Sequence, residues 1–238
     1  MSVLTNKIDF AVVVVVNNAN PNGDPLNGNR PRVTYDGLGE ISDVCIKRKV
    51  RNRLLERGEA IFVQSDDYRF DDYRSLRSRA EGELSKEDLK DPSKLRKAAC
   101  GKWYDVRAFG QVFAFSGGGK GKKAAGVSVG IRGPVSVHPA FSITPVNTSS
   151  IQITKSVSGE GDGTKRGSDT MGMKHRVDHG VYVFVGSINP QLAKGTGFTA
   201  EDAQALKYAL THLFDNDASS ARPEGSMEVY RVLWWEHS

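Results

Sequence analysis

Several short stretches combine residue types that could do chemistry, and the first is a serine motif. The segment GVSVG, residues 126–130, matches the nucleophile-elbow pattern G-x-S-x-G of hydrolases. An elbow needs a sharp turn from a strand into a helix to expose its serine. Valines alternate straight through this segment instead, which predicts a continuing strand with Ser128 as an ordinary strand residue.

A second stretch has two histidines at the spacing of a zinc site. His175 and His179 are four residues apart, but the segment between them lacks the glutamate of H-E-x-x-H and leads directly into an apolar strand. On an extended chain the two imidazoles would lie roughly 13 Å apart, too far for a shared zinc at about 2 Å per ligand bond. The sequence therefore predicts no metal and no cofactor.

A third stretch, SGGGKGKK at residues 116–123, resembles a phosphate-binding loop. It does not fit G-x-x-x-x-G-K-[ST], and no helix follows to direct its N-terminus at a phosphate. Two interpretations stay open: a mobile loop, or one whose lysines touch phosphates without order (Lys120, Lys122 and Lys123).

The fourth stretch, ISDVCIKRKVRNRLLERG at residues 41–58, predicts a helix that begins at Ser42 or Asp43 and ends at Gly58. From Lys47 to Arg57 it has six cations and one acid, Glu56; the cations are Lys47, Arg48, Lys49, Arg51, Arg53 and Arg57. A solvated helix normally intersperses acidic partners, so this repulsion is expected to be largely uncompensated. The helix therefore predicts an external anion, such as nucleic-acid phosphate.

The loop NANPNGDPLNGNRPR, residues 18–32, precedes this helix and is longer than a simple reversal of two to five residues requires. It contains Asn22, Asn27, Arg30 and Arg32. We expect the two arginines to extend the basic patch, so that the loop helps to hold a nucleic-acid backbone.

Bulk composition agrees with an anionic partner without proving one. The 238 residues carry a formal charge of +5 with a pI near 9.1. Cys45 and Cys100 fit no metal spacing and are expected to be reduced in a cytoplasmic protein. The segment IDFAVVVVV is too short to span a bilayer and contains Asp9, and no signal-peptide features are present, so no membrane partner is expected.

The firm elements predict one domain over residues 1–238. Apolar and β-branched runs predict strands at Ile8–Val16, Val127–Val137, Val181–Asn189 and residues 227–237, and VRAFGQVFAF (106–115) is also strand-like. Helical periodicity recurs at residues 199–214, where Thr199 and Asp202 have capping-box spacing. The order β, α, β, β, α, β is that of an α+β, RRM-like or ferredoxin-like fold.

Two insertions interrupt this order. Residues 60–100 are highly charged, and the stretch 65–98 predicts a partly helical insertion rather than core. Residues 144–180 form a long excursion in which Met171 and Met173 accompany basic residues. Apolar tips on a basic arm suit wedging between bases; the alternative is a disordered surface loop.

Six segments together resemble a known family. NPNGDPLNGNRPR, GEISDVCIKRKVRNRL, DVRAFGQVF, ITKSVSGEG, TMGMKHRVDHGVYV and RPEGSMEVYR look like the type I-C CRISPR Cascade backbone subunit, the seventh Cas family of the RAMP superfamily. The resemblance runs in order from about Asp9 to the C-terminus. The family usually continues with a further segment after MEVYRVLWWEHS. Two interpretations stay open, a compact variant and a shortened chain, and the resemblance does not carry over the contacts of that segment.

The resemblance implies a non-enzymatic protein whose copies polymerise along the spacer of a CRISPR RNA. An RRM-like palm would hold the RNA, residues 60–100 would form a finger-like insertion, and residues 144–180 a β-hairpin thumb. Expected partners are CRISPR RNA, target DNA paired to the guide, neighbouring copies, the large Cascade subunit and the repeat-handle-binding subunit. Implied RNA contacts are Asn22, Asn27, Arg30, Arg32, Lys47, Arg48, Lys49, Arg51, Lys155, Met171, Met173, Lys174, His175 and Arg176.

Two other hypotheses remain open. Related type III backbone subunits use a thumb aspartate to cut target RNA, and Asp162 or Asp169 could be placed for a metal-dependent ribonuclease. A free-standing RRM-like RNA chaperone would instead be a monomer that binds diverse RNAs without forming filaments.

Overall fold

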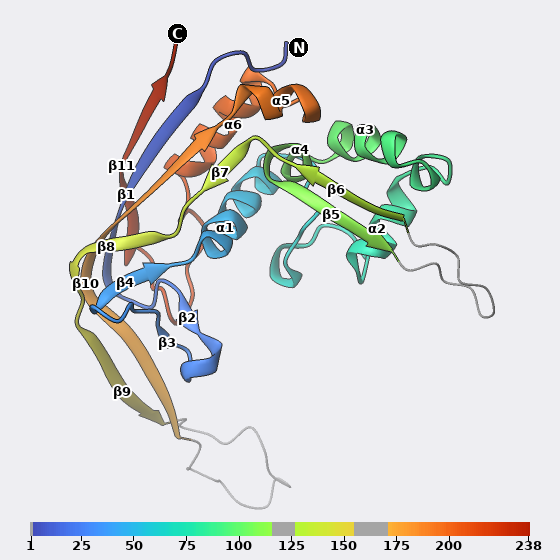
Figure 1. The fold of residues 1–238 in the computed structure, drawn as a ribbon. Coiled ribbons are helices and arrows are strands. Elements are labelled where there is room, and N and C mark those ends of the chain that lie inside the picture. The colour runs from blue at the N-terminus through green and yellow to red at the C-terminus, as the bar shows by residue number, and fades with distance from the viewer. Residues whose placement is uncertain (1, 116–126, 155–170) are drawn as a thin grey trace, which may run out of the picture.

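A large antiparallel sheet organises the chain (Figure 1). The computed structural model describes residues 2–115, 127–154 and 171–238. The strand order is β11-β1-β10-β8-β4, and β7 and β9 also pair with β10. These strands are β1 (Ile8–Ala19), β4 (Leu38–Ile41), β7 (Val135–Val137), β8 (Ala140–Pro145), β9 (Thr148–Thr154), β10 (Met171–Ile188) and β11 (Met227–Glu236).

Strand β1 lies inside the sheet, between β10 and β11. Its β-branched run suits a strand with neighbours on both edges. Phe10, Val12, Val14 and Val16 are each at most 1% exposed. The strand predicted at Ile8–Val16 is confirmed and continues to Ala19.

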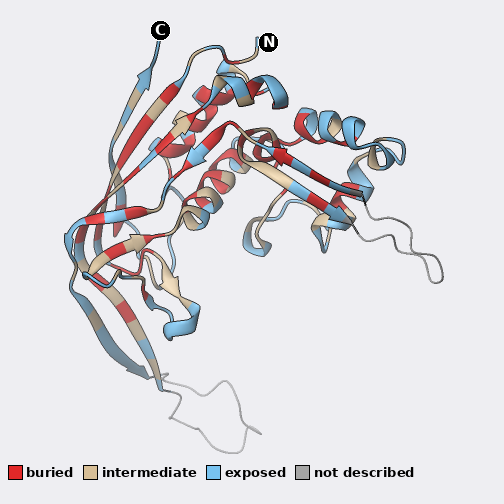
Figure 2. Ribbon diagram, viewed as in Figure 1, coloured by how far each residue is buried: buried red, intermediate tan, exposed pale blue. Residues whose placement is uncertain are grey.

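Helices α1 (Asp43–Glu56), α5 (Pro190–Thr196) and α6 (Ala200–Thr211) contribute buried residues to the same core as β1 (Figures 1 and 2). Ser42 caps α1 by accepting a hydrogen bond from the backbone N–H of Cys45. Thr199 and Asp202 form the predicted capping box at the start of α6. The helices predicted at 41–58 and 199–214 are confirmed, with ends a few residues shorter.

The charged insertion builds a second core. It contains the 3₁₀ turns at Asp66–Tyr68 and Asp88–Lys90, helices α2 (Leu76–Glu83) and α3 (Pro92–Lys102), and is followed by α4 (Tyr104–Phe109). Strands β5 (Gly110–Phe115) and β6 (Val127–Arg132) form a separate two-stranded sheet beside them. Phe62, Leu95 and Trp103 are buried in this core. The prediction of a partly helical insertion is confirmed, but the prediction that it lacks core residues is wrong.

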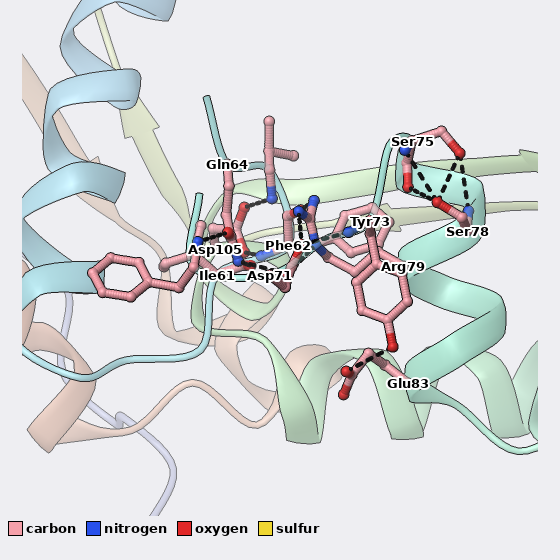
Figure 3. Close-up of polar contacts among 12 residues, drawn as sticks. Ile61, Phe62, Gln64, Asp71, Tyr73, Ser75, Ser78, Arg79, Glu83 and Asp105 are labelled. Atoms are coloured by element: carbon pink, nitrogen blue, oxygen red, sulfur yellow. Dashed lines mark hydrogen bonds and ion pairs between the residues drawn. The ribbon is translucent and has the colours of Figure 1, made fainter. Parts of the chain in front are cut away.

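Two carboxylate-centred contacts, at Asp105 and Asp71, hold the start of this insertion (Figure 3). Asp105, 1% exposed, accepts hydrogen bonds from the backbone N–H groups of Phe62 (2.7 Å) and Val63 (3.0 Å). The buried guanidinium of Arg79 donates to both Asp71 oxygens (2.8 and 2.7 Å) and to the Phe62 carbonyl (2.7 Å). Charged residues are thus used inside the insertion as well as on its surface.

The single strand predicted at Val127–Val137 is wrong. Strand β6 pairs with β5, whereas β7 pairs with β10. The chain crosses between the sheets at Gly133, where a Cβ would collide with the carbonyl oxygen of Ala108. Ser128 lies in β6 opposite Ala114 of β5, as expected for an ordinary strand residue.

Residues 106–115 are also not one strand. The first part belongs to α4, and the strand β5 begins at Gly110, whose φ of +82° favours glycine.

Both cysteines are free thiols. No helix in the described segments is both long and apolar enough to cross a membrane.

Candidate nucleic-acid interface

The opening loop, residues 18–32, folds into a short hairpin. Strands β2 (Gly23–Asp24) and β3 (Arg30–Pro31) pair across a 3₁₀ turn at Pro25–Asn27, which Asp24 caps through the backbone N–H of Leu26. The side chain of Asn20 donates to the Asn29 carbonyl at 2.7 Å and closes the hairpin. The turn-forming residues therefore build a defined projection whose tip exposes Asn27.

Asn22 attaches this hairpin to the N-terminus of α1. Its side-chain oxygen accepts hydrogen bonds from the backbone N–H of Ser42 (2.9 Å) and from the Ser42 hydroxyl (2.8 Å). The loop and the basic helix are therefore adjacent, as expected. The Asn22 oxygen already holds the helix cap.

Arg30 and Arg32 have different environments. Arg30 is exposed, and its Nη1 donates to the Ser150 hydroxyl of β9 at 3.3 Å. Arg32 is partly buried and lies 3.5 Å from Asp24, while its Nε has no hydrogen-bond partner among the described residues. Arg30 thus connects the opening loop to the β9–β10 hairpin.

Strands β9 and β10 form this second hairpin in register from Met171 opposite Thr154 to Val177 opposite Thr148. Ser150 lies opposite His175, and the Ser150 Oγ is 2.8 Å from His175 Nδ1. A contact chain of Arg30, Ser150 and His175 therefore joins two segments that are 120 residues apart.

The strand period of two separates the predicted hairpin residues onto two faces. Met171 and Met173 share the face of His175 and are 67% and 54% exposed. Lys174 and Arg176 lie on the opposite face. Lys155, Asp162 and Asp169, and the loop lysines Lys120, Lys122 and Lys123, lie outside the described residues.

The prediction that the charge on α1 is largely uncompensated is wrong. Lys47 pairs with Asp43 (2.9 Å) and Arg48 with Asp67 (2.9 Å). Lys49 pairs with Asp217, Arg51 with Asp105 at 2.9 Å, and Arg53 with Glu56 at 2.7 Å. The acids for Arg48, Lys49 and Arg51 come from distant segments, so helical spacing alone could not reveal them.

These cations differ in access to a ligand. Lys49 is only 5% exposed, and burial lowers the pKa of its ammonium group, opposed by the charge of Asp217. Arg51 is mostly buried over the Phe109 ring. Arg48 is 55% exposed and remains open to a partner despite its ion pair.

A small pocket of about 120 Å³ lies where the loop meets α1. Asn22, Arg48 and Lys49 line it together with Asn52, Asp217 and Arg222. Arg222, which donates to Asp217 at 3.0 Å, was missed as a site residue, although it begins the segment RPEGSMEVYR that contributed to the family resemblance. The charged lining of three cations and one acid favours an anion.

In the segments the structure describes, no cluster of three or more His, Cys, Asp or Glu side chains could hold a metal ion.

Comparison with protein families places this geometry in context. Residues 6–238 match the family model described as CRISPR-associated protein Cas7. The chain belongs to the Cas7 family. A curated relative, the CRISPR-associated protein Cas7 of Haloferax volcanii, is 27% identical over 225 residues, covering 90% of this chain and 66% of the relative. This Cas7 chain therefore spans slightly less than two thirds of that protein.

Two chains in solved structures have a similar fold at low sequence identity. A chain of a pre-nicking CRISPR RNA-guided surveillance complex has a TM-score of 0.51 at 16% identity, covering 87% of this chain and 68% of that one. A chain of the type III-B Cmr-beta complex bound to cognate target RNA has a TM-score of 0.50 at 11% identity, covering 97% and 61%. At these identities the likeness concerns the mixed α/β fold with its large antiparallel sheet.

Proposed function

We propose that this chain is a non-catalytic backbone subunit of a type I-C CRISPR effector complex and binds CRISPR RNA along the guide. The observation that carries the proposal is the junction of Arg30, Ser150 and His175, where the opening loop meets the β9–β10 hairpin beside the basic helix α1. Membership of the Cas7 family over residues 6–238 supports the same conclusion.

In this proposal the sheet with α1 and α6 is an RRM-like palm. Its strand order β11-β1-β10-β7, with the two helices connecting β1 to β7 and β10 to β11, agrees with a ferredoxin-like arrangement. The β9–β10 hairpin acts as the thumb, and Met171 and Met173 on its exposed face separate bases. Residues 60–100 contribute the finger-like insertion.

The polar residues divide between structure and binding. Asn27, Arg30 and Arg48 contact guide phosphates from the loop and α1, and Lys174 and Arg176 do so from the hairpin. Asn22, Lys49 and Arg51 hold the loop and helix in place through their internal bonds. Base pairing of the guide, rather than the protein, would read the target DNA. The complex would be cytoplasmic and include neighbouring copies, the large subunit and the repeat-handle-binding subunit.

Co-purification tests this function. The chain is expressed with a type I-C repeat-spacer array and its partner subunits, and the bound RNA is sequenced. We expect discrete repeat-flanked guides, and an Arg30→Ala/Arg48→Ala variant should retain fewer of them than the matched surface variant Lys86→Ala/Lys90→Ala. Mixed cellular RNA, or none, would refute the assignment.

The ribonuclease hypothesis requires a separate assay. Incubating the assembled complex with complementary RNA and Mg²⁺ should leave that RNA intact if the subunit is non-catalytic. Regularly spaced cuts that disappear in an Asp162→Ala or Asp169→Ala variant would instead identify a type III-like activity.

A further inference from the structure

Residues of α3 and α5 line a second basic cleft. These two helices lie at the other end of the molecule from the β9–β10 hairpin (Figure 1). The cleft has a volume of about 590 Å³ and lies between α3, on the second core, and α5, on the main core. The charged residues that line it are Arg96, Lys97, Arg107, Lys194 and Asp202.

The charges in this cleft do not cancel. Arg107 donates to both oxygens of Asp202, at 3.0 and 2.7 Å, so this acid is already neutralised. Arg96, Lys97 and Lys194 are exposed, and no ion pair to an acid joins any of them within the described residues. This differs from α1, where Lys47, Arg48, Lys49, Arg51 and Arg53 all have acidic partners.

One polar side chain that lines the cleft, Thr196, has a hydroxyl group without a hydrogen-bond partner among the described residues. Thr196 is 7% exposed. A buried hydroxyl without a partner is costly, and it can donate to an anionic oxygen. Thr199 and Asp202, the capping box of α6, line the same cleft.

We propose that this cleft binds the phosphate group of a nucleotide. Its volume falls in the range of roughly 300–1,000 Å³ typical of small-ligand sites, so it has room for a sugar beside the phosphate. None of the described residues that line it is aromatic, so there is no platform on which a base could stack. Recognition therefore depends on the phosphate and does not depend on base identity.

Lysine footprinting of the full chain tests the site directly. Mass spectrometry measures the rate at which Lys97 and Lys194 are acetylated. The rate is compared without ligand, with adenosine 5′-monophosphate, and with a ten-nucleotide single strand of thymidines. Lys207, which lies over the Trp234 ring on another part of the surface, is the internal reference. We expect Lys97 and Lys194 to react at least about threefold more slowly with ligand, while the reactivity of Lys207 is unchanged.

Two charge-reversal pairs provide the matched control. Ligand binding is measured as the slowing of hydrogen exchange in peptides that contain Thr199. In Lys97→Glu/Lys194→Glu, the ligand concentration that gives half-maximal slowing should rise at least about tenfold. Lys86→Glu/Lys90→Glu makes the same change in net charge on exposed residues outside the cleft and should have little effect. Circular dichroism verifies that both variants keep the fold.

Two outcomes would identify the source of the phosphate, and two others would overturn the proposal. Protection by both ligands supports a site that accepts free nucleotides, and protection by the strand alone supports a site for a polynucleotide. Absence of protection by either ligand would overturn the proposal. Equal weakening by the two charge-reversal pairs would also overturn it, because general electrostatics would then explain the binding.

Discussion

At the residue scale, the buried carboxylate of Asp105 accepts three hydrogen bonds. It accepts from the N–H groups of Phe62 and Val63 and from Arg51 Nε. One side chain thus joins α1, the start of the charged insertion and α4. Truncating it would leave Arg51 and two backbone donors unpaired in a dry environment.

Asp105→Ala should therefore lower the free energy of unfolding by about 3–5 kcal/mol, the cost of breaking a buried ion pair from one side. Asp67→Ala is the matched control, because Asp67 pairs with Arg48 at the surface and should contribute less than about 1 kcal/mol. Urea denaturation measures both. Similar losses in the two variants would show that Asp105 has no special structural role.

Asp71 makes the stability of the insertion depend on pH. Hydrogen bonds from Arg79 hold the pKa of this carboxyl below its ordinary value of 3.8. Above that value the carboxylate is charged in both folded and unfolded chains, so the pair contributes in full. As the pH falls through 3.8 towards the lower folded pKa, the unfolded chain takes up the proton first and this contribution is lost.

Unfolding free energy measured between pH 6 and about pH 3 should consequently fall less steeply in Asp71→Asn than in the wild type at the acidic end. Asp72→Asn, on the exposed neighbouring residue, should keep the wild-type pH profile. Identical slopes for the wild type and Asp71→Asn would contradict this role.

At the element scale, the β9–β10 hairpin has little burial of its own. Strand β9 is exposed almost throughout (Figure 2), and Ser150 connects it both to Arg30 and to His175. At its base β10 reaches the main core through Val177, so the outer part of the hairpin depends on strand pairing and a few polar contacts rather than on a core of its own.

Ser150→Ala should weaken these contacts by about 1 kcal/mol, equivalent to roughly fivefold faster amide exchange across residues 148–154. Thr154→Ala, at an exposed position of the same strand, should leave exchange unchanged. Hydrogen exchange with mass spectrometry compares the two. Unchanged exchange in Ser150→Ala would mean that strand pairing alone holds the hairpin.

At the scale of the whole molecule, two hydrophobic cores meet at α4. Trp103 belongs to the second core, whereas its neighbour Tyr104 belongs to the main core. The Tyr104 hydroxyl donates to the Asp202 carbonyl at 2.6 Å, and Arg107 holds the Asp202 carboxylate. These contacts couple the charged insertion to the sheet.

Arg107→Ala should loosen that coupling, so that amides of α3 exchange about tenfold faster while those of α6 change much less. Lys90→Ala, an exposed cation in the same insertion, is the control. Hydrogen exchange under native conditions resolves both helices. An equal increase in α3 and α6 would indicate that the two cores unfold as one unit.

Elements with local signals could be predicted from the sequence. The β-branched run of β1, the Ser42 cap of α1 and the Thr199–Asp202 capping box are set by residues within a few positions of one another. Steric and hydrogen-bonding preferences at that range act in almost any fold. The resemblance to a CRISPR-associated family was likewise visible in the order of several local motifs, and the match to the Cas7 family over residues 6–238 agrees with it.

Which charges on α1 are available to a partner depends on contacts between distant segments. Lys49 meets an acid 168 residues away and Arg51 one 54 residues away, and no periodicity along the chain reports such pairs. The division of residues 127–137 between two sheets also depends on long-range pairing with β5 and β10. Similarly, Arg30 reaches Ser150 across 120 residues. Long-range contacts arise only when the core closes, so composition can suggest a basic surface but not where its charge remains available.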